Sequence, residues 1–428
     1  MIISSQFQKF IKDRSNHRYI QFVCAIILIV NVATLILSFA TQVRGRTLFG
    51  PYLGADFASF YVAGSIFSSY SPEQIYDREL HTLVYRELFP DLPPNIQLPY
   101  ANTPFFILPF VLLAQLPYSW AYFSWLLISI GLYVAGFTLL KQTLLAIPKM
   151  ASRTLLLLAL SFMPFITESL AGGQVAPFGF FWLAVALRCE RRDQQAMSGI
   201  ALAFCTYKPT LLLLILPMLI ITKRSSILLG FVFGSMGLAF VSVLTVGWQG
   251  FLNYIDMLLY FTNASTTTQS PLRTWKYVDI NSFSRLLAGG NVLLGQIISL
   301  GTAAVVLPLL FRTWQRANHT GKHLQGLAWS LTITWNLVLN IYVGIYDTIM
   351  VILSVLITIN IFYEQKTCNP LPQTLPSSYK IIIFLLYITP WFTQFIAQTI
   401  HLQLYTIILT IFGLYQYTLV QDKRYRST

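Results

Sequence analysis

The segment GADFASFYVAG, residues 54–64, contains one carboxylate, Asp56, among glycine, alanine and aromatic residues. It follows soon after the first long apolar run of the chain ends. An acid held against Phe57, Phe60 and Tyr61 would be partly desolvated, which raises its pKa and suits it to accept a proton near neutral pH. The alternative is that Asp56 only caps a helix starting at Phe57, because Asp favours that position. Asp56 is therefore the candidate general base, with capping left open.

Lys208 lies in CTYKPTLLL, between two apolar runs, 195–207 and 209–222, that are each too short to cross a bilayer comfortably. A lysine at that depth costs several kcal/mol unless it is paired, so it indicates a functional cation. We expect its anionic partner to be the phosphate of a membrane lipid. The alternative is a lysine whose chain snorkels to the interface.

Two further polar residues lie at the ends of apolar runs. Gln174 in AGGQVAP can donate hydrogen bonds to hydroxyls or phosphate oxygens, although a plain turn explains its glycines equally well. Asp347 in NIYVGIYDTIMV could orient a substrate hydroxyl or cap the following helix.

The segment SPLRTWKYVDINSFSRLLAGG combines cations, aromatic rings and amides, a mixture suited to a sugar phosphate, although a solvated loop would carry similar residues. Arg285 begins an apolar stretch and could reach a buried phosphate, and Arg273 is the second candidate of this kind. Because sugars stack on aromatic faces, the candidate substrate-binding residues also include Trp275, Tyr61 and Tyr100.

The composition of the chain indicates the class of protein fold that must position these residues. The chain has 428 residues, of which 55% are hydrophobic and only 10% charged. Its mean hydropathy is +0.63, which predicts an integral membrane protein. The net charge of +13 could suggest nucleic acid, but the basic residues form short clusters between apolar runs, so membrane topology explains them better.

Apolar runs and the positive-inside rule predict an all-α polytopic fold with about twelve spans and both termini in the cytoplasm. The cytoplasmic turns then hold 20 of the 28 Lys and Arg residues. The expected spans are 19–40, 118–140, 152–171, 175–189, 195–207, 209–222, 226–247, 291–311, 324–340, 345–363, 380–398 and 401–420.

Three other elements complete the expected single domain, residues 1–428. Residues 103–117 would reach only about 21 Å as a helix against a hydrocarbon core of about 30 Å, so they predict a half-membrane segment lining a cavity. The first long outer loop, 41–102, should hold an amphipathic surface helix at 73–89, with Tyr76, Leu80, Leu83, Val84 and Leu88 on one face, and a second surface helix at the Asp56 segment. The other long outer loop is 248–290.

Several kinds of chemistry lack their sequence motifs. The sequence has no P-loop, HExxH, GxSxG or Rossmann fingerprint. No DxD motif stands near Asp56, which argues against a tightly held divalent metal, and the sequence indicates no cofactor.

Ordered short motifs carry a family resemblance over residues 50 to 360. They are DFASFYVAGSIF with YSPEQIYD, LPYANTPFFILPFVLLAQLP, the GGQVAPFGFFWLAVALRCERRDQQAMSGIALAFCTYKPTLLLLILPMLI stretch, NSFSRLL and YDTIMVIL. This pattern resembles glycosyltransferase family eighty-seven of the C-type superfamily, which includes mannosyltransferases that use polyprenyl-phosphate-mannose. Two departures stand out: LNIYVGI replaces the proline and histidine expected before YD, and YANTP replaces YPP.

The resemblance implies a base on the first outer loop, Asp56, the glutamine of a GQ motif, Gln174, an intramembrane lysine, Lys208, and the acid of the YD motif, Asp347. It implies sugar transfer from a polyprenyl-phosphate donor to a hydroxyl of a glycan or glycolipid, on the extracytoplasmic face of a bacterial plasma membrane. Asp56 would act as the base and Lys208 with Arg285 or Arg273 would stabilise the leaving phosphate. We expect inversion, because a retaining enzyme needs a second close carboxylate. The alternative is a transporter or flippase of lipid-linked saccharides, which also needs broken helices and buried cations.

Overall fold

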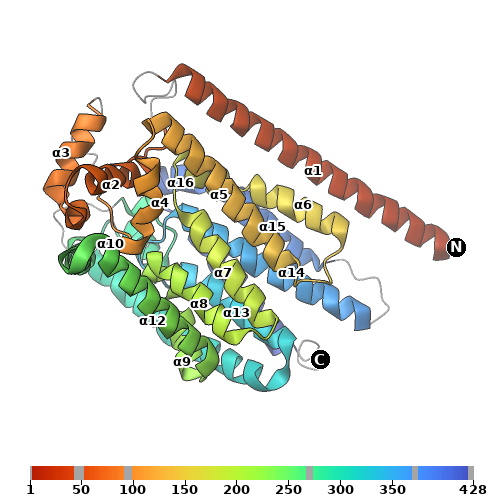
Figure 1. The fold of residues 1–428 in the computed structure, drawn as a ribbon. Helices are drawn as coiled ribbons and strands as arrows, with labels where there is room; N and C mark the ends of the chain where they lie inside the picture. Colours follow the sequence, from red (N-terminus) through yellow and green to blue (C-terminus); the bar gives the residue numbers. More distant parts are fainter. Residues whose placement is uncertain (1, 43–52, 91–98, 267–272, 369–374, 423–428) are drawn as a thin grey trace.

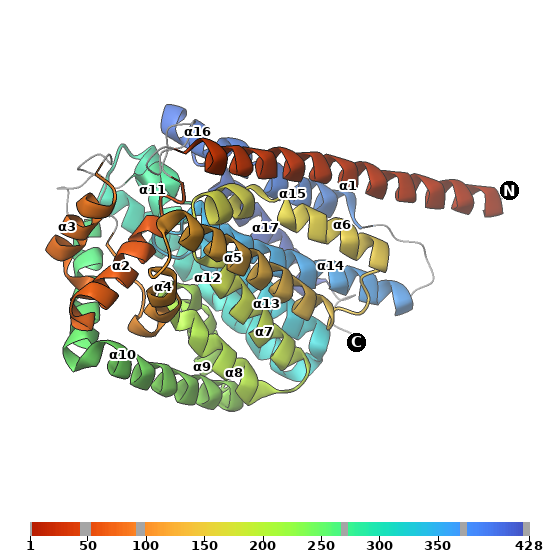
Figure 2. The same cartoon turned by 45° about the horizontal axis from the view of Figure 1, so that its top comes forward.

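The structure is a computed structural model that describes residues 2–42, 53–90, 99–266, 273–368 and 375–422. Within these ranges every regular element is a helix, and the only β-type pairing is an isolated antiparallel bridge between Tyr277 and Gly344. Figures 1 and 2 show a bundle whose helices run side by side, with α1 along one flank and α10 along another.

The centre of the bundle consists of helices that pack closely against one another. These are α5 (Tyr118–Lys141), α7 (Ala176–Arg191), α8 (Gln195–Phe204), α13 (Lys322–Val338), α14 (Val351–Cys368) and α17 (Leu404–Gln421). The surrounding helices are α1 (Ile2–Thr41), α6 (Lys149–Leu160), α9 (Ile215–Ile221), α10 (Ser225–Thr266), α12 (Val292–Thr320), α15 (Ser377–Ile388) and α16 (Pro390–Ile400).

Short helices occupy one end of the bundle and the breaks within it. At the end lie α2 (Phe57–Ser69), η1 (Pro72–Tyr76), α3 (Arg78–Leu88), η2 (Pro104–Ile107), α4 (Leu108–Leu113), η6 (Thr274–Lys276) and α11 (Ile280–Leu287). The breaks hold η3 (Pro164–Ala171), η4 (Cys205–Tyr207), η5 (Pro209–Leu212) and η7 (Ile345–Met350).

Six described helices are long and apolar enough to cross a membrane: Asn16–Thr41, Tyr118–Lys141, Ser225–Tyr260, Val292–Asn318, Ile345–Glu364 and Leu404–Gln421. Two bent helix pairs are further candidates if each pair counts as one span. They are α6 with η3, bent by 47°, and α15 with α16, bent by 65°. The structure therefore supports a multi-pass membrane protein with six to eight candidate spans. The four other expected spans are helical but short, with 16 residues in α7, 10 in α8, 7 in α9 and 17 in α13, against the roughly 20 that a straight crossing needs.

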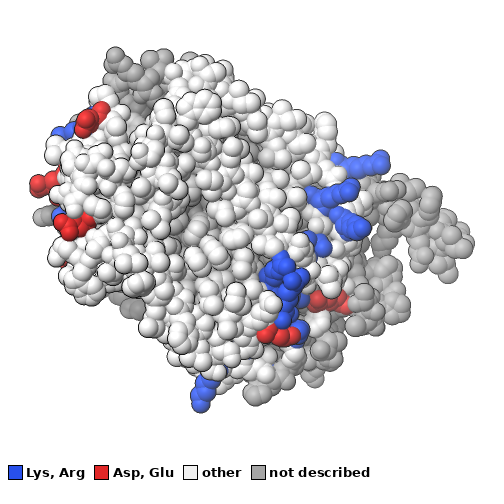
Figure 3. Space-filling model, in the orientation of Figure 1, with Lys and Arg blue, Asp and Glu red and all other residues white. Residues whose placement is uncertain are grey.

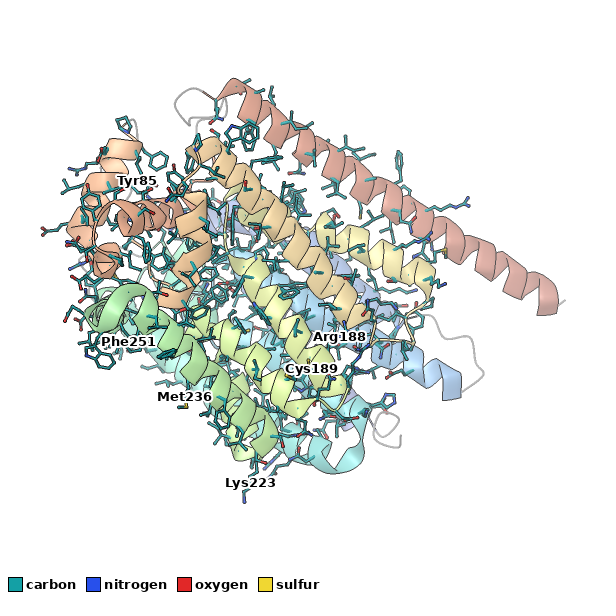
Figure 4. All side chains as sticks on the ribbon, in the orientation of Figure 1. Tyr85, Arg188, Cys189, Lys223, Met236 and Phe251 are labelled. Atoms are coloured by element: carbon teal, nitrogen blue, oxygen red, sulfur yellow. The ribbon has the colours of Figure 1, made fainter. Side chains whose placement is uncertain are left out.

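The surface of the bundle fits a lipid environment. Apolar side chains are exposed along α10, including Phe233, Met236, Phe240 and Leu244, and Figure 4 shows Met236 and Phe251 on the outer side of this helix. In Figure 3 the visible Asp and Glu lie mainly at the end that carries α3, and most visible Lys and Arg lie toward the opposite end, with an uncharged surface between.

The first outer loop differs from the sequence expectation in two ways. The helix at Asp56 forms, as α2, but it packs inside the protein rather than on its surface, because Phe57, Phe60 and Ile66 fit against α4 and α5. The amphipathic segment divides into η1 and α3, and only part of the expected apolar face is buried, at Tyr76 and Val84. His81, Val84 and Tyr85 are the buried residues of that helix, while Leu83 and Leu88 are exposed.

Broken helices deliver the polar residues to one region. The predicted half-membrane segment forms η2 and α4, both short and largely buried. Lys208 stands at the break between η4 and η5, and η3 has π-helical geometry directly before the Gly172–Gly173 turn. The helix α10 continues past its non-helical Gly247 into the expected second outer loop. At such breaks the chain changes direction, so that backbone groups and side chains can point into the interior of the bundle. A continuous helix would not place them there.

Candidate active site

Asp56 lies at the N-cap position of α2, but its side chain makes no capping hydrogen bond. Gln174 Nε2 instead donates to Asp56 Oδ2 at 2.7 Å, across 118 positions of the sequence. Burial raises the pKa of the Asp56 carboxyl above its usual value, while the Gln174 hydrogen bond and the positive charge of Lys276 act in the opposite direction. Asp56 thus has the position of a helix cap, but its side chain bonds to Gln174 instead of to the backbone of α2.

The turn after η3 holds Asp56 through the backbone as well. Gly172 O accepts hydrogen bonds from Asp56 N at 3.0 Å and Phe57 N at 3.3 Å. Gly173 has φ +76°, and a Cβ there would lie 2.5 Å from Phe57 Cβ. The paired glycines therefore allow the close approach that seats the Asp56 helix against the Gln174 turn.

Lys208 is paired with a carboxylate of the protein. Its Nζ lies 2.5 Å from Asp347 Oδ2, and the lysine is half-buried while Asp347 is almost fully buried. Asp347 Oδ1 has no hydrogen-bond partner in the structure. Asp347 is therefore the counter-ion of Lys208, and its second oxygen is buried without a hydrogen-bond partner.

Tyr346 joins the two halves of the site. Lys208 Nζ lies 4.8 Å from the centre of the Tyr346 ring, and this tyrosine is within electrostatic reach of both Asp56 and Asp347. Lys208 therefore lies against this ring, and Asp56 is near enough to interact with it electrostatically.

The expected second outer loop contributes Lys276. This exposed lysine lies 5.5 Å from the Trp275 ring centre and interacts electrostatically with Asp56 and with Glu168. Trp275 is half-buried, and its carbonyl accepts a hydrogen bond from Gln403 Nε2 at 2.9 Å. Gln403 thus fixes the loop from which Lys276 reaches the site.

The two candidate arginines occupy different positions. Arg285 is 7% exposed, and its Nη1 donates to the Tyr342 hydroxyl at 2.8 Å. Tyr342 has φ +55°, a left-handed conformation that is uncommon for a bulky residue and often accompanies functional sites. Arg273 is exposed, and its carbonyl accepts from Lys276 N at 2.9 Å.

Tyr61 and Tyr100 lie in the packing between the outer-loop helices. The Tyr61 hydroxyl donates to Leu116 O at 2.9 Å, and the Tyr100 hydroxyl donates to Thr103 O at 3.1 Å. Both side chains are buried. Their role as substrate-binding residues remains a prediction.

The fold brings three further residues to the site, Lys276, Glu168 and Tyr346. Lys276 and Glu168 belong to polar segments that the motifs already mark, so their charge was a sequence signal that could identify them as site residues. Tyr346 directly precedes the acid of the YD motif, but only the turn at η7 shows that its ring lies beneath Lys208. Among the described residues no group of three or more His, Cys, Asp or Glu could hold a metal ion.

The structure is thus an apolar helical bundle of a membrane protein, with an acid, a cation and amide groups gathered at its breaks. The sequence matches the model of glycosyltransferase family 87 over residues 100–339, more than half of the chain, so the chain belongs to this family of membrane glycosyltransferases. No curated protein and no solved structure gave a match. Family membership confirms the resemblance inferred from the motifs and favours a transferase over a transporter.

Proposed function

We propose that this glycosyltransferase moves a sugar, mannose or another hexose or pentose, from a polyprenyl-phosphate donor to a hydroxyl of a glycan or glycolipid. The observation that carries the proposal is that Asp56 pairs with Gln174 and Lys208 pairs with Asp347, while both Lys208 and Asp56 are near enough to Tyr346 to interact with it. A base and a cation near one residue suit a displacement in which a nucleophile enters at one end and a phosphate leaves at the other.

In the proposed reaction the Asp56 carboxylate takes the proton of the acceptor hydroxyl as its oxygen forms a bond to the anomeric carbon. The bond from that carbon to the lipid phosphate breaks, and the phosphate leaves with both electrons. Lys208 stabilises the charge developing on the phosphate, with Arg285 as the second cation, because fixed charges aimed at a leaving group lower the barrier most. Arg273, which is exposed, is the alternative second cation.

The remaining polar groups orient the substrates. Gln174 aligns the Asp56 carboxylate, and the unpartnered Asp347 Oδ1 accepts a hydroxyl of the sugar. Trp275 offers an aromatic face for the acceptor, beside Lys276. The reaction needs no metal or cofactor, since the base and the cations come from the protein.

Inversion at the anomeric carbon is part of the proposal. Glu168 is a second carboxyl within electrostatic reach of Asp56, and a retaining double displacement would need such a neighbour. The anomeric configuration of the product and the activity of Glu168→Gln therefore decide the point. An inverted product with active Glu168→Gln supports inversion, and a retained product overturns it.

We further propose that the whole chain, residues 1–428, is one domain with about twelve membrane passages in the fold of the C-type superfamily, counting the shorter helices as crossings of a bent bundle. The Lys- and Arg-rich end faces the cytoplasm with both termini, and the site faces the outside of a bacterial plasma membrane, in the cell envelope. Cysteine labelling from each side of the membrane tests this orientation, with one cysteine placed at Glu79 and another at Arg192.

The decisive experiment incubates the purified protein in lipid vesicles with a panel of labelled polyprenyl-phosphate sugars and an extract of membrane glycolipids. We expect one donor class to be consumed, and Asp56→Asn to lower the rate by about 100- to 10,000-fold, the usual contribution of a general base. Arg86→Gln, which changes an exposed charge on α3, is the matched control. Normal turnover by a folded Asp56→Asn protein would contradict the proposal.

A further inference from the structure

Asp279 is a fully buried carboxylate at the start of α11 that the proposed reaction does not use. Its Oδ1 accepts from Ser282 N at 2.8 Å, which caps the helix. Its Oδ2 accepts from Ser282 Oγ at 2.9 Å and from Val343 N at 3.0 Å. The last bond joins two segments that are 64 positions apart.

A helix cap alone does not explain this carboxylate. Serine or asparagine caps a helix as well as aspartate does and buries no charge. A buried carboxylate carries a desolvation cost that only its hydrogen bonds offset. The second oxygen, bonded to Val343, therefore indicates a role between segments rather than within α11.

The bond to Val343 is the centre of a short paired structure. Val278 N donates to Val343 O at 2.9 Å, and Tyr277 and Gly344 form the isolated antiparallel bridge. We call residues 275–279 the loop strip and residues 343–347 the η7 strip. On the far side of the loop strip, Thr406 Oγ1 donates to Val278 O at 2.8 Å, so the strip lies between α17 and η7.

Each strip carries one half of the site. Lys276, on the loop strip, interacts electrostatically with Asp56. Asp347, on the η7 strip, holds Lys208. The η7 strip begins directly after Tyr342, whose left-handed backbone turns the chain into the strip.

We propose that Asp279 is a positioning residue that fixes the loop strip against the η7 strip and so keeps the Asp56 and Lys208 halves of the site in one geometry. This role rests on the proposed function for its effect on rate, but not for its effect on structure. Lys276 acts on the base and Lys208 on the leaving phosphate, so the two cations need a fixed separation. A hydrogen bond between their supporting segments supplies it.

The test uses the full-length protein in detergent or vesicles and three variants. Asp279→Asn is isosteric and can still cap α11 with its amide oxygen, but its NH2 group cannot accept from Val343 N. Asp279→Ser caps the helix and removes the second oxygen altogether. Ser282→Ala removes one hydroxyl donor and leaves both backbone bonds to Asp279, so it is the matched control.

The first readout is hydrogen exchange of peptides covering the two strips. We expect Asp279→Asn and Asp279→Ser to exchange faster in residues 274–280 and 341–348 together, and Ser282→Ala to match the wild type. This arm needs no substrate. It therefore judges the positioning role even if Asp56→Asn shows that the proposed function is wrong.

The second readout is the single-turnover rate. Asp279→Asn should be at least about tenfold slower, because a displacement near 1 Å at a site can cost on the order of 100-fold. The Michaelis constants should change less than about threefold, since the binding groups remain. In the double variant Asp279→Asn with Asp347→Asn, the fold-loss in rate should be smaller than the product of the two single fold-losses, because both changes disturb the η7 strip.

Several outcomes would overturn the proposal. They are wild-type exchange in both strips of a folded Asp279→Asn protein, a wild-type rate, or fully multiplicative losses with Asp347→Asn. Failure of both Asp279→Asn and Asp279→Ser to give folded protein would also overturn it, since Asp279 would then serve the stability of the fold and not the geometry of the site.

Discussion

Gln174 Nε2 and Asp56 Oδ2 lie 2.7 Å apart, and this hydrogen bond joins the turn before α7 to the start of α2. It orients the carboxylate and also tunes it, because a donated hydrogen bond stabilises the ionised form. The same turn accepts the backbone N–H of Asp56 through Gly172. The candidate base is therefore held by side chain and backbone from one segment.

Replacing Gln174 by leucine should lower kcat/KM by about 10- to 100-fold, since a hydrogen bond to a charged group contributes about 1.5–3 kcal/mol. The base must be ionised, so activity falls as pH drops through the pKa of Asp56, which burial already raises. Loss of the Gln174 bond raises that pKa further, and the acid limb of the kcat/KM profile should move to higher pH. Gln249→Leu, at an exposed glutamine of α10, is the control and should leave the limb in place.

Variants of the Lys208–Asp347 pair should distinguish an effect on stability from an effect on activity. Lys208→Met leaves a buried carboxylate unpaired and should destabilise the protein, toward the lower end of about 3–5 kcal/mol because Lys208 is partly exposed. The double variant Lys208→Met with Asp347→Leu should regain stability but remain inactive. Thermal unfolding and sugar-transfer assays on the wild type, the single variant and the double variant provide the measurement. An active double variant would show that Lys208 takes no part in the reaction.

Lys276 should act on the base through charge. Lys276→Gln removes a cation that favours the ionised Asp56, so the acid limb should move to higher pH. Because Lys276 is exposed, high salt should shrink the difference from the wild type. Lys276→Arg should restore the wild-type limb, and Arg86→Gln should not move it. An acid limb unchanged at low salt would show that Lys276 does not influence the base.

Gly173 is a point where one methyl group should disturb the site. Gly173→Ala places a Cβ at φ +76° and 2.5 Å from Phe57 Cβ, and it should cost about 1–3 kcal/mol of stability and lower activity. Gly131→Ala, in α5, meets no atom within 4 Å and should be neutral or stabilising. Unfolding in detergent compares the two variants, and equal stability of both would contradict the role given to the turn.

Composition and hydropathy were enough to predict a helical membrane protein, and the order of short motifs was enough to predict its family, because both properties are local to the sequence. The break at Lys208 and the short elements after Thr103 were also visible, since their apolar runs are too short to span. The prediction that α2 lies on the surface was wrong, since this helix packs inside the protein. An apolar face looks the same whether lipid or protein covers it.

Sequence alone selected Asp56, Gln174, Lys208 and Asp347 as candidates, but only the tertiary structure decided how they pair. Lys208 and Asp347 are 139 positions apart, and Asp279 reaches Val343 across 64. Such pairs depend on where helices bend, as at η3 and η7, and on which faces then meet. A hydrogen bond tolerates only a few tenths of an ångström, and no periodicity in the sequence fixes helix positions that closely.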